Sequence, residues 1–251
     1  QGDFPDPQEV QSKTDAPRWE DLLADGADQL PRRLITRLGH IYVPCALCGS
    51  PFWHCYTRLG FSGMMRGLRE APEVIDACNA ANLPGLLAHA RAMWEVGVRC
   101  MFVEECFSSA DLISTHDYQR FALGPTRDLL QGLRDIGFQV VYYYCGALEG
   151  RLEHLASLPV NALAFEESKK GFTIDLGGIR QEIGPDPLLF GNVDVVLIRD
   201  GSEEAIAAEV ARQYEVAGPR YVVSMGSPAT LDTPPHKLDM LVRAANRLGP
   251  R

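Results

Sequence analysis

The sequence predicts an α/β fold, a TIM (β/α)8-type barrel, and three observations support this prediction. Short apolar runs of strand length alternate with longer segments of helical spacing through most of the 251 residues. Repeated strand-then-helix units indicate parallel strands, because a parallel pair needs a long crossover and a helix is the usual one. Polar residues gather where several successive strands end, and barrel enzymes build their active sites at that face.

The elements are expected in the following order. The stretch 1–17 is polar, contains three prolines and has no apolar period, so we expect a flexible arm or loop. Residues 18–251 are expected to form a single barrel domain. Six strands are predicted in it: Ile41–Cys48, Cys100–Glu105, Gln139–Cys145, Ala162–Glu166, Leu188–Asn192 and Tyr221–Met225. Three segments show an apolar stripe of helical period: Pro72–Val96, Asp117–Ile136 and Ser202–Ala217. The barrel is therefore expected to lack, or not to show, its first strands.

Composition and missing motifs exclude several functional classes. A net charge of −9 disfavours broad binding to nucleic acid or anionic lipid, because like charges repel. No apolar run reaches the roughly 18 residues of a membrane span, and the N-terminus does not resemble a signal peptide. No GxGxxG or GxxxxGK[ST] motif supports an open nucleotide-binding sheet. Nucleic acid and membranes are therefore not expected as partners.

The seven cysteines indicate a reducing compartment, because an odd number scattered through apolar runs is not typical of a secreted disulfide framework. We expect a cytoplasmic protein. Cys45 and Cys48 form a CxxC pair, a spacing that can indicate zinc or redox chemistry. The first cysteine lies within a predicted strand and the second near its end, which is not typical of a metal knuckle.

Several stretches resemble the uroporphyrinogen decarboxylase superfamily. Tyr221–Leu241 (YVVSMGSPATLDTPPHKLDML) is similar to its closing strand and helix, and Ile183–Asp194 (IGPDPLLFGNVD) to its "G-x-x-x-x-L-x-GN-x-D" strand. Upstream, LCGSPFW, LGFSGMMRGLREAPEVI and MFVEECFSSADLISTHDYQRFALGPTRDLL resemble further strands and helices. VVYYYCGALEGRLEHLA aligns with the strand that carries "H-x-C-G" in the corrinoid-linked methyltransferases. The resemblance covers Arg18 to Arg251 and implies a barrel enzyme.

The chain also departs from both well-known branches of this superfamily. It contains no arginine-rich "RQAGR" segment, which grips substrate carboxylates in the decarboxylases. Their "FDSW" strand end corresponds to VEEC, so Glu104 or Glu105 replaces the essential aspartate, and their "LGHG" histidine corresponds to Ser227. In the methyltransferases, the zinc ligands correspond to Tyr143, Cys145 and Ser227. Of these three, only Cys145 is a usual zinc ligand.

The residues themselves suggest chemistry at two strand ends. Along a strand, alternation sends one of Glu104 and Glu105 toward the barrel mouth and the other toward the helices. One of them is expected to be a general acid/base or a metal ligand; the alternative is two solvated loop carboxylates. Tyr143 and Cys145 share strand parity and should face one side. Cys145, Cys106 and Glu105 are the candidate metal ligands, although a buried cysteine can also be a small apolar residue.

Polar residues at the ends of the later strands are the candidate substrate contacts. They are Glu166, Asn192, Asp194 and Ser227, since amides and carboxylates at strand ends can fix a polar ligand. For Glu166, the alternative is a charged surface turn. The ring of Phe52 is expected to line the substrate pocket; the alternative is that it packs in the core.

Three functions remain open at this point. The leading hypothesis is methyl-group transfer, linked to a corrinoid or a thiol, on a small organic substrate, with zinc as a cofactor and a corrinoid protein as a partner. The second is a cofactor-free decarboxylase-type lyase that acts on a tetrapyrrole or another carboxylated substrate. The third is a catalytically silent barrel that acts as a binding partner. A second copy of the chain, forming a homodimer, is a further candidate partner.

Overall fold

The structure, a computed structural model, describes residues 4–12, 16–26, 28–169 and 171–249. It contains one six-stranded sheet in which the strand order follows the chain, β1-β2-β3-β4-β5-β6. β1 pairs with β2, β4 with β5 and β5 with β6, each in parallel. The strands are β1 (Cys45–Gly49), β2 (Cys100–Glu105), β3 (Gln139–Tyr144), β4 (Ala162–Phe165), β5 (Leu188–Phe190) and β6 (Tyr221–Val222). The predicted α/β class with six visible strands is confirmed.

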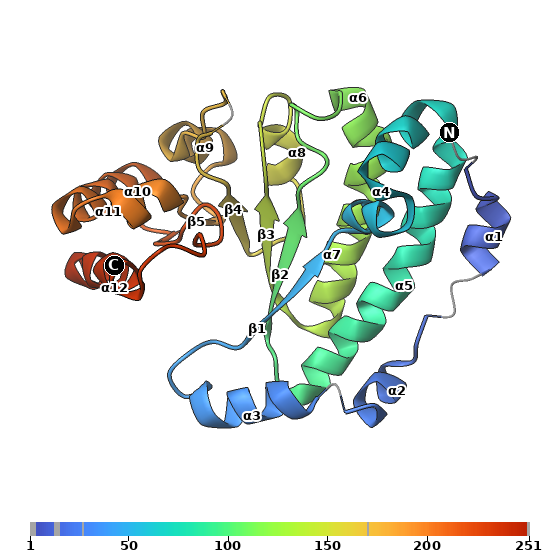
Figure 1. Ribbon diagram of the computed structural model, residues 1–251, viewed down its shortest axis with the longest axis horizontal. Coiled ribbons are helices and arrows are strands. Elements are labelled where there is room, and N and C mark those ends of the chain that lie inside the picture. Colours follow the sequence, from blue (N-terminus) through green and yellow to red (C-terminus); the bar gives the residue numbers. More distant parts are fainter. Residues whose placement is uncertain (1–3, 13–15, 27, 170, 250–251) are drawn as a thin grey trace. The chain divides into compact units, whose positions relative to one another are not determined.

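The chain forms two compact units (Figure 1). Unit 1 comprises Gln1–Tyr142 and Leu158–Val160, and unit 2 comprises Tyr143–Ser157 and Asn161–Arg251. Strand β3 begins in unit 1 and ends in unit 2. The expectation of a single domain over 18–251 stays a prediction, and residues 250–251 of that range lie outside the described part of the chain.

Unit 1 packs long helices against its strands. Its helices are α1 (Pro7–Ser12), α2 (Trp19–Ala24), α3 (Gln29–Leu38), α4 (Pro51–Glu70), α5 (Pro72–Val96), α6 (Thr115–Asp117), the π-helical η1 (Tyr118–Leu123) and α7 (Gly124–Ile136). Helix α4 contacts β1 and β2, and α5 packs against α4 and α7. Fully buried side chains from these elements, among them Met64, Ile75, Met101 and Leu130, form the core. Burial of these apolar groups is the main stabilising term for such a unit.

Local sequence signals set the helix ends of unit 1. Ser50 caps α4 by accepting a hydrogen bond from the backbone N–H of Trp53 at 2.9 Å. Helix α7 ends at Gly137, which has φ +119°, a conformation that glycine adopts at little cost. A Cβ at this position would lie 2.7 Å from the Trp94 ring, so the close approach also requires glycine.

Unit 2 combines short strands with helices at the C-terminal end of the chain. Its helices are α8 (Leu152–Ala156), α9 (Leu176–Ile183), α10 (Val195–Asp200), α11 (Glu203–Ala217) and α12 (Pro235–Leu248). Val193, Ile198, Ile206, Val210 and Leu241 form its apolar cluster, which joins the end of β5 to α10, α11 and α12. This packing holds the loops that follow β5 and β6.

Some boundaries differ from the sequence-based predictions. Within the expected N-terminal arm, Pro7–Ser12 form α1, because Asp6 accepts from the N–H of Gln8 and Val10 is buried against α5. Residues 1–3 and 13–15 of that arm lie outside the described residues. The helix predicted over Asp117–Ile136 includes the π-helical turn η1. Strand β1 starts at Cys45 rather than Ile41, since Pro44 has no N–H for a ladder. Among the described helices, none has the length and apolar character to cross a membrane.

Candidate functional site

Glu105 lies at the end of β2 and is fully buried in unit 1. Its carboxylate accepts hydrogen bonds from the Ser50 hydroxyl and from the backbone N–H of Phe107, the latter at 2.8 Å. Burial raises the pKa of Glu105 to about 7, although these donors oppose the rise. Since Ser50 also caps α4, the carboxyl of Glu105 ties the end of β2 to the start of that helix.

Glu104 occupies the opposite face of β2, as strand alternation requires, and is paired with Gly49 of β1. Its side chain is half-buried, and it accepts a hydrogen bond from the Cys106 thiol at 3.2 Å. A carboxylate and a thiol in contact can relay a proton or supply an oxygen and a sulfur ligand to a metal ion. Of the two glutamates, Glu104 is the one whose carboxylate meets a thiol.

Aromatic side chains gather beside this strand end. Phe107 stacks on Tyr56 with ring centroids 5.0 Å apart and lies 6.1 Å from the Trp53 ring and 6.0 Å from Phe61. Tyr56 and Phe61 are exposed, so this group presents an apolar surface to solvent. Phe52, the ring expected to wall the pocket, is fully buried in the core instead. Its role in substrate binding stays a prediction that this placement does not support.

In unit 2, the loop after β4 builds a network of charges. Lys169 Nζ lies 2.5 Å from Glu166 Oε1 and 3.3 Å from Glu167 Oε1, and it donates to Ser227 Oγ at 2.9 Å. Ser227 in turn donates to Glu167 Oε2 at 2.8 Å. Burial alone would lower the pKa of Lys169, but the two carboxylates raise it. Two glutamates and one lysine give this network a formal charge of −1.

Tyr143 and Cys145 lie at the end of β3 and are both buried in unit 2. The Tyr143 hydroxyl donates to the backbone oxygen of Gly226. Burial, followed by the proximity of Cys145 and Glu166, raises the pKa of Tyr143. The phenol therefore stays protonated at neutral pH and acts as a hydrogen-bond donor. The interaction of Tyr143 with Cys145 agrees with their common strand parity.

The remaining sequence candidates have mainly structural contacts. Asn192 donates from Nδ2 to the backbone oxygen of Glu166 at 3.2 Å, so it holds the loop after β4. Asp194 caps α10 by accepting from the N–H of Val196 at 2.7 Å. Ser227 belongs to the charged network. Substrate binding by these three side chains stays a prediction.

The sequence offered at least one glutamate of the Glu166–Glu167 pair as a substrate contact, but it gave no role to Lys169 or Gly226. A run of charges reads as a surface turn, yet both glutamates of this run are buried. A Cβ on Gly226 would collide with the backbone nitrogen and the carboxylate of Glu167. A usable signal is that opposite charges follow the apolar Ala162–Phe165 strand directly, since charges at the end of a buried strand are stable only when they are paired. Lys170, the next residue of that run, lies outside the described residues.

Comparisons with known proteins identify related sequences and folds. The family model described as "Uroporphyrinogen decarboxylase (URO-D)" matches residues 32–248. A uroporphyrinogen decarboxylase of Syntrophotalea carbinolica is 26% identical over 208 residues, which cover 80% of this chain and 58% of that protein. The methylcobamide:CoM methyltransferase MtbA of Methanosarcina acetivorans is 22% identical over 186 residues, which cover 74% of this chain and 51% of that protein. The chain thus spans about half to three fifths of these curated relatives.

Among solved structures, a methyltransferase from Methanosarcina mazei is similar, with a TM-score of 0.77 at 20% sequence identity. The similarity covers 88% of this chain and 63% of that one. At this level of identity, the likeness supports the fold and leaves the reaction open.

Proposed function

We propose that the chain, which belongs to the uroporphyrinogen decarboxylase (URO-D) family, is a methyl-transfer enzyme. It acts on a small organic substrate, and the methyl transfer is linked to a corrinoid or to a thiol. Membership in this family confirms the resemblance found in the sequence, and the α/β fold with its open, parallel six-stranded sheet agrees with it. The relatives include decarboxylases and a methyltransferase, so the reaction has to be argued from the chain's own side chains.

The contact between Cys106 and Glu104 is the observation that carries the proposal. Thiolates and carboxylates are accepted zinc ligands, so this pair fits the donor set that the cofactor requires. Cys106 is the first residue after β2, and Glu104 lies near the end of that strand. In a parallel barrel, residues that follow the strands belong to the functional face. We therefore propose Cys106 and Glu104 of unit 1 as candidate zinc ligands, and we keep Cys145 as a third candidate from the sequence alone.

This ligand set differs from the one expected from sequence in one residue. The sequence placed Glu105 among the metal ligands and first among the acid/base candidates, but its carboxyl is held by Ser50 and Phe107. Glu104 takes both roles in the proposal because it faces the Cys106 thiol. When bound, zinc would hold a substrate thiol in its reactive thiolate form.

The charged network of unit 2 favours methyl transfer over the lyase alternative. Its formal charge of −1 repels substrates with several carboxylates, such as the tetrapyrroles that a decarboxylase of this family would process. A small substrate with at most one negative charge carries much less of this penalty. In the proposal, Glu166 and Lys169 contact the polar end of the substrate, and the Tyr143 phenol donates a hydrogen bond from the end of β3.

Metal analysis of the purified protein tests the proposal. We expect about one zinc ion per chain in the wild type, and less than a tenth of it in Cys106→Ala and Cys145→Ala. Cys48→Ala is the matched control, because burial raises the pKa of that thiol to about 12 and disfavours a thiolate ligand. A metal-free wild type, or zinc retained in both variants, would refute the zinc assignment.

An activity assay then separates the three functions. The protein is incubated with methylcobalamin and a panel of small thiols, and the loss of the methyl–cobalt absorbance is followed. Methyl transfer that depends on Cys106 supports the proposal, and a corrinoid protein then becomes the expected partner. Decarboxylation of uroporphyrinogen by the zinc-free protein would support the lyase instead. Neither activity in the folded protein would favour the silent barrel.

A further inference from the structure

Cys45 and Cys100 occupy directly paired positions at the beginning of β1 and β2. The parallel register places Cys45 opposite Cys100 and Leu47 opposite Phe102, so the two thiols project from the same face of the sheet. Cys48, the other cysteine of the CxxC pair, lies three residues further along and projects from the opposite face. The partner of Cys45 is therefore the cysteine of the neighbouring strand.

The spacing of paired strands suits a bond between these thiols. Neighbouring strands lie about 4.8 Å apart, which is within the range of Cα separations of about 4.4 to 6.8 Å that disulfides span. The thiols already interact, since hydrogen bonding to Cys45 lowers the pKa of Cys100 and the same contact raises that of Cys45. Cys100 is thus the better nucleophile of the pair, and Cys45 holds the proton.

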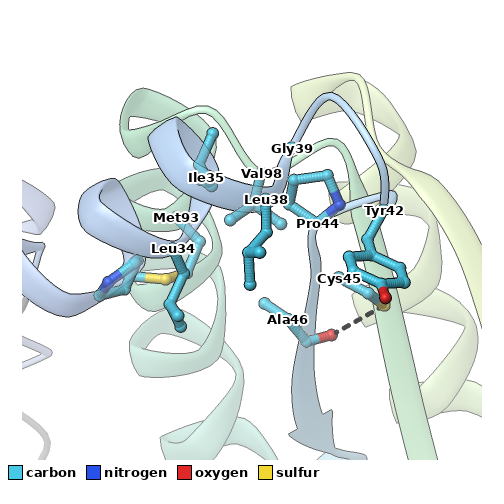
Figure 2. Close-up of a pocket in the computed structure, with 11 residues that line it drawn as sticks. Leu34, Ile35, Leu38, Gly39, Tyr42, Pro44, Cys45, Ala46, Met93 and Val98 are labelled. Atoms are coloured by element: carbon cyan, nitrogen blue, oxygen red, sulfur yellow. Dashed lines mark hydrogen bonds between the residues drawn. The ribbon is translucent and has the colours of Figure 1, made fainter.

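Solvent can reach both thiols. Cys45 is exposed and Cys100 is half-buried. Cys45 also lies in the wall of an open apolar cavity of about 480 Å³ below α3, beside Tyr42, Pro44 and Ala46, and Figure 2 shows its sulfur near the backbone oxygen of Ala46. An oxidant of low molecular weight can therefore approach the pair from solvent.

We propose that Cys45 and Cys100 form a reversible redox modification site, which a small disulfide such as oxidised glutathione converts to an intramolecular disulfide. The Cys100 thiolate attacks one sulfur of oxidised glutathione, and one glutathione leaves as a thiolate. The Cys45 thiol then loses its proton and attacks the Cys100 sulfur, which releases the second glutathione. The protein loses two thiols and two electrons, and the oxidant is reduced to two glutathione molecules.

A second pair of cysteines in unit 1 provides an internal comparison. Cys55 of α4 and Cys78 of α5 also interact with each other, yet both are fully buried. An oxidant that stays in solvent cannot reach them in the folded protein. The proposal therefore predicts oxidation of the exposed pair and not of the buried one.

The test uses the full chain, reduced first with dithiothreitol and then equilibrated with oxidised glutathione. After denaturation, we expect the thiol count to fall from the seven cysteines of the sequence to five, and dithiothreitol to restore it. Peptide mapping should find one cross-link, between Cys45 and Cys100. The variant Cys45→Ser should carry glutathione on Cys100, because no second thiol resolves the mixed disulfide. The control Cys55→Ser should still form the cross-link.

Three results would overturn the proposal. They are seven thiols remaining after oxidation, a cross-link that involves any other cysteine, and a wild type that retains glutathione on Cys45 or Cys100. None of them depends on the proposed methyl transfer, because the pair lies at the start of the strands, and Glu104 and Cys106 lie at their end.

Discussion

Replacing Glu105 by glutamine should change how the stability of unit 1 depends on pH. The carboxyl is fully buried, and its pKa is raised to about 7 from an ordinary value of 4.5, chiefly by burial. The glutamine side chain has the same shape and is neutral at every pH. The variant should therefore behave like a wild type whose Glu105 stays protonated.

The size of the effect follows from the two pKa values. Below pH 4.5 the Glu105 carboxyl is protonated in both the folded and the unfolded chain. The folded state therefore has its full free energy of unfolding in this pH range. Between pH 4.5 and about 7, the unfolded chain has released the proton and the folded chain still holds it, so stability falls as the pH rises. At 1.36 kcal/mol for each pKa unit, the loss above pH 7 reaches about 3 kcal/mol.

Tryptophan fluorescence can follow the unfolding of unit 1 alone, because Trp19, Trp53 and Trp94 all lie in that unit. Urea unfolding at pH values from 4.5 to 8 should show the free energy of unfolding of Glu105→Gln gaining about 3 kcal/mol relative to wild type. Ser50→Ala removes a hydrogen-bond donor that lowers the pKa of Glu105, so that pKa should rise further. The fall in the free energy of unfolding with pH should then continue to a higher pH than in the wild type. Parallel curves for wild type and Glu105→Gln would refute the reasoning.

Substitutions at three further positions test unit 2, each by thermal and urea unfolding followed by circular dichroism. Gly226→Ala should cost about 1 to 3 kcal/mol because its Cβ collides with Glu167, and an unchanged midpoint would contradict this packing. Lys169→Met should cost about 3 kcal/mol, since it leaves Glu166 and Glu167 without their cation, and Lys169→Arg should recover part of the loss. Tyr143→Phe should cost about 1 kcal/mol for the lost hydrogen bond to Gly226, and wild-type stability would exclude that bond.

The six strands and their order in the sheet followed from the sequence because they depend on local patterns. Apolar runs with polar ends marked all six strands, and alternation divided Glu104 from Glu105. Alternation alone could not say which glutamate faced the helices, since that depends on the partner that each side chain meets. Ser50 is 55 residues away in sequence and meets Glu105 only when β1 pairs with β2. The bonds of Lys169 to Ser227 depend in the same way on the distant loop after β6.

In the proposed function, the two faces of β2 have different roles, one structural and one chemical. On the helix side, Met101, Val103 and Glu105 are completely buried, and the carboxyl there is bonded to a helix cap. On the other side, Glu104 remains half-buried beside a thiol. A carboxyl that reacts with a substrate needs access to it, and Glu105, which is completely enclosed, has none in this structure. In the proposal, Glu104 therefore stands where the decarboxylases carry their aspartate, while Glu105 anchors the helix that follows β1.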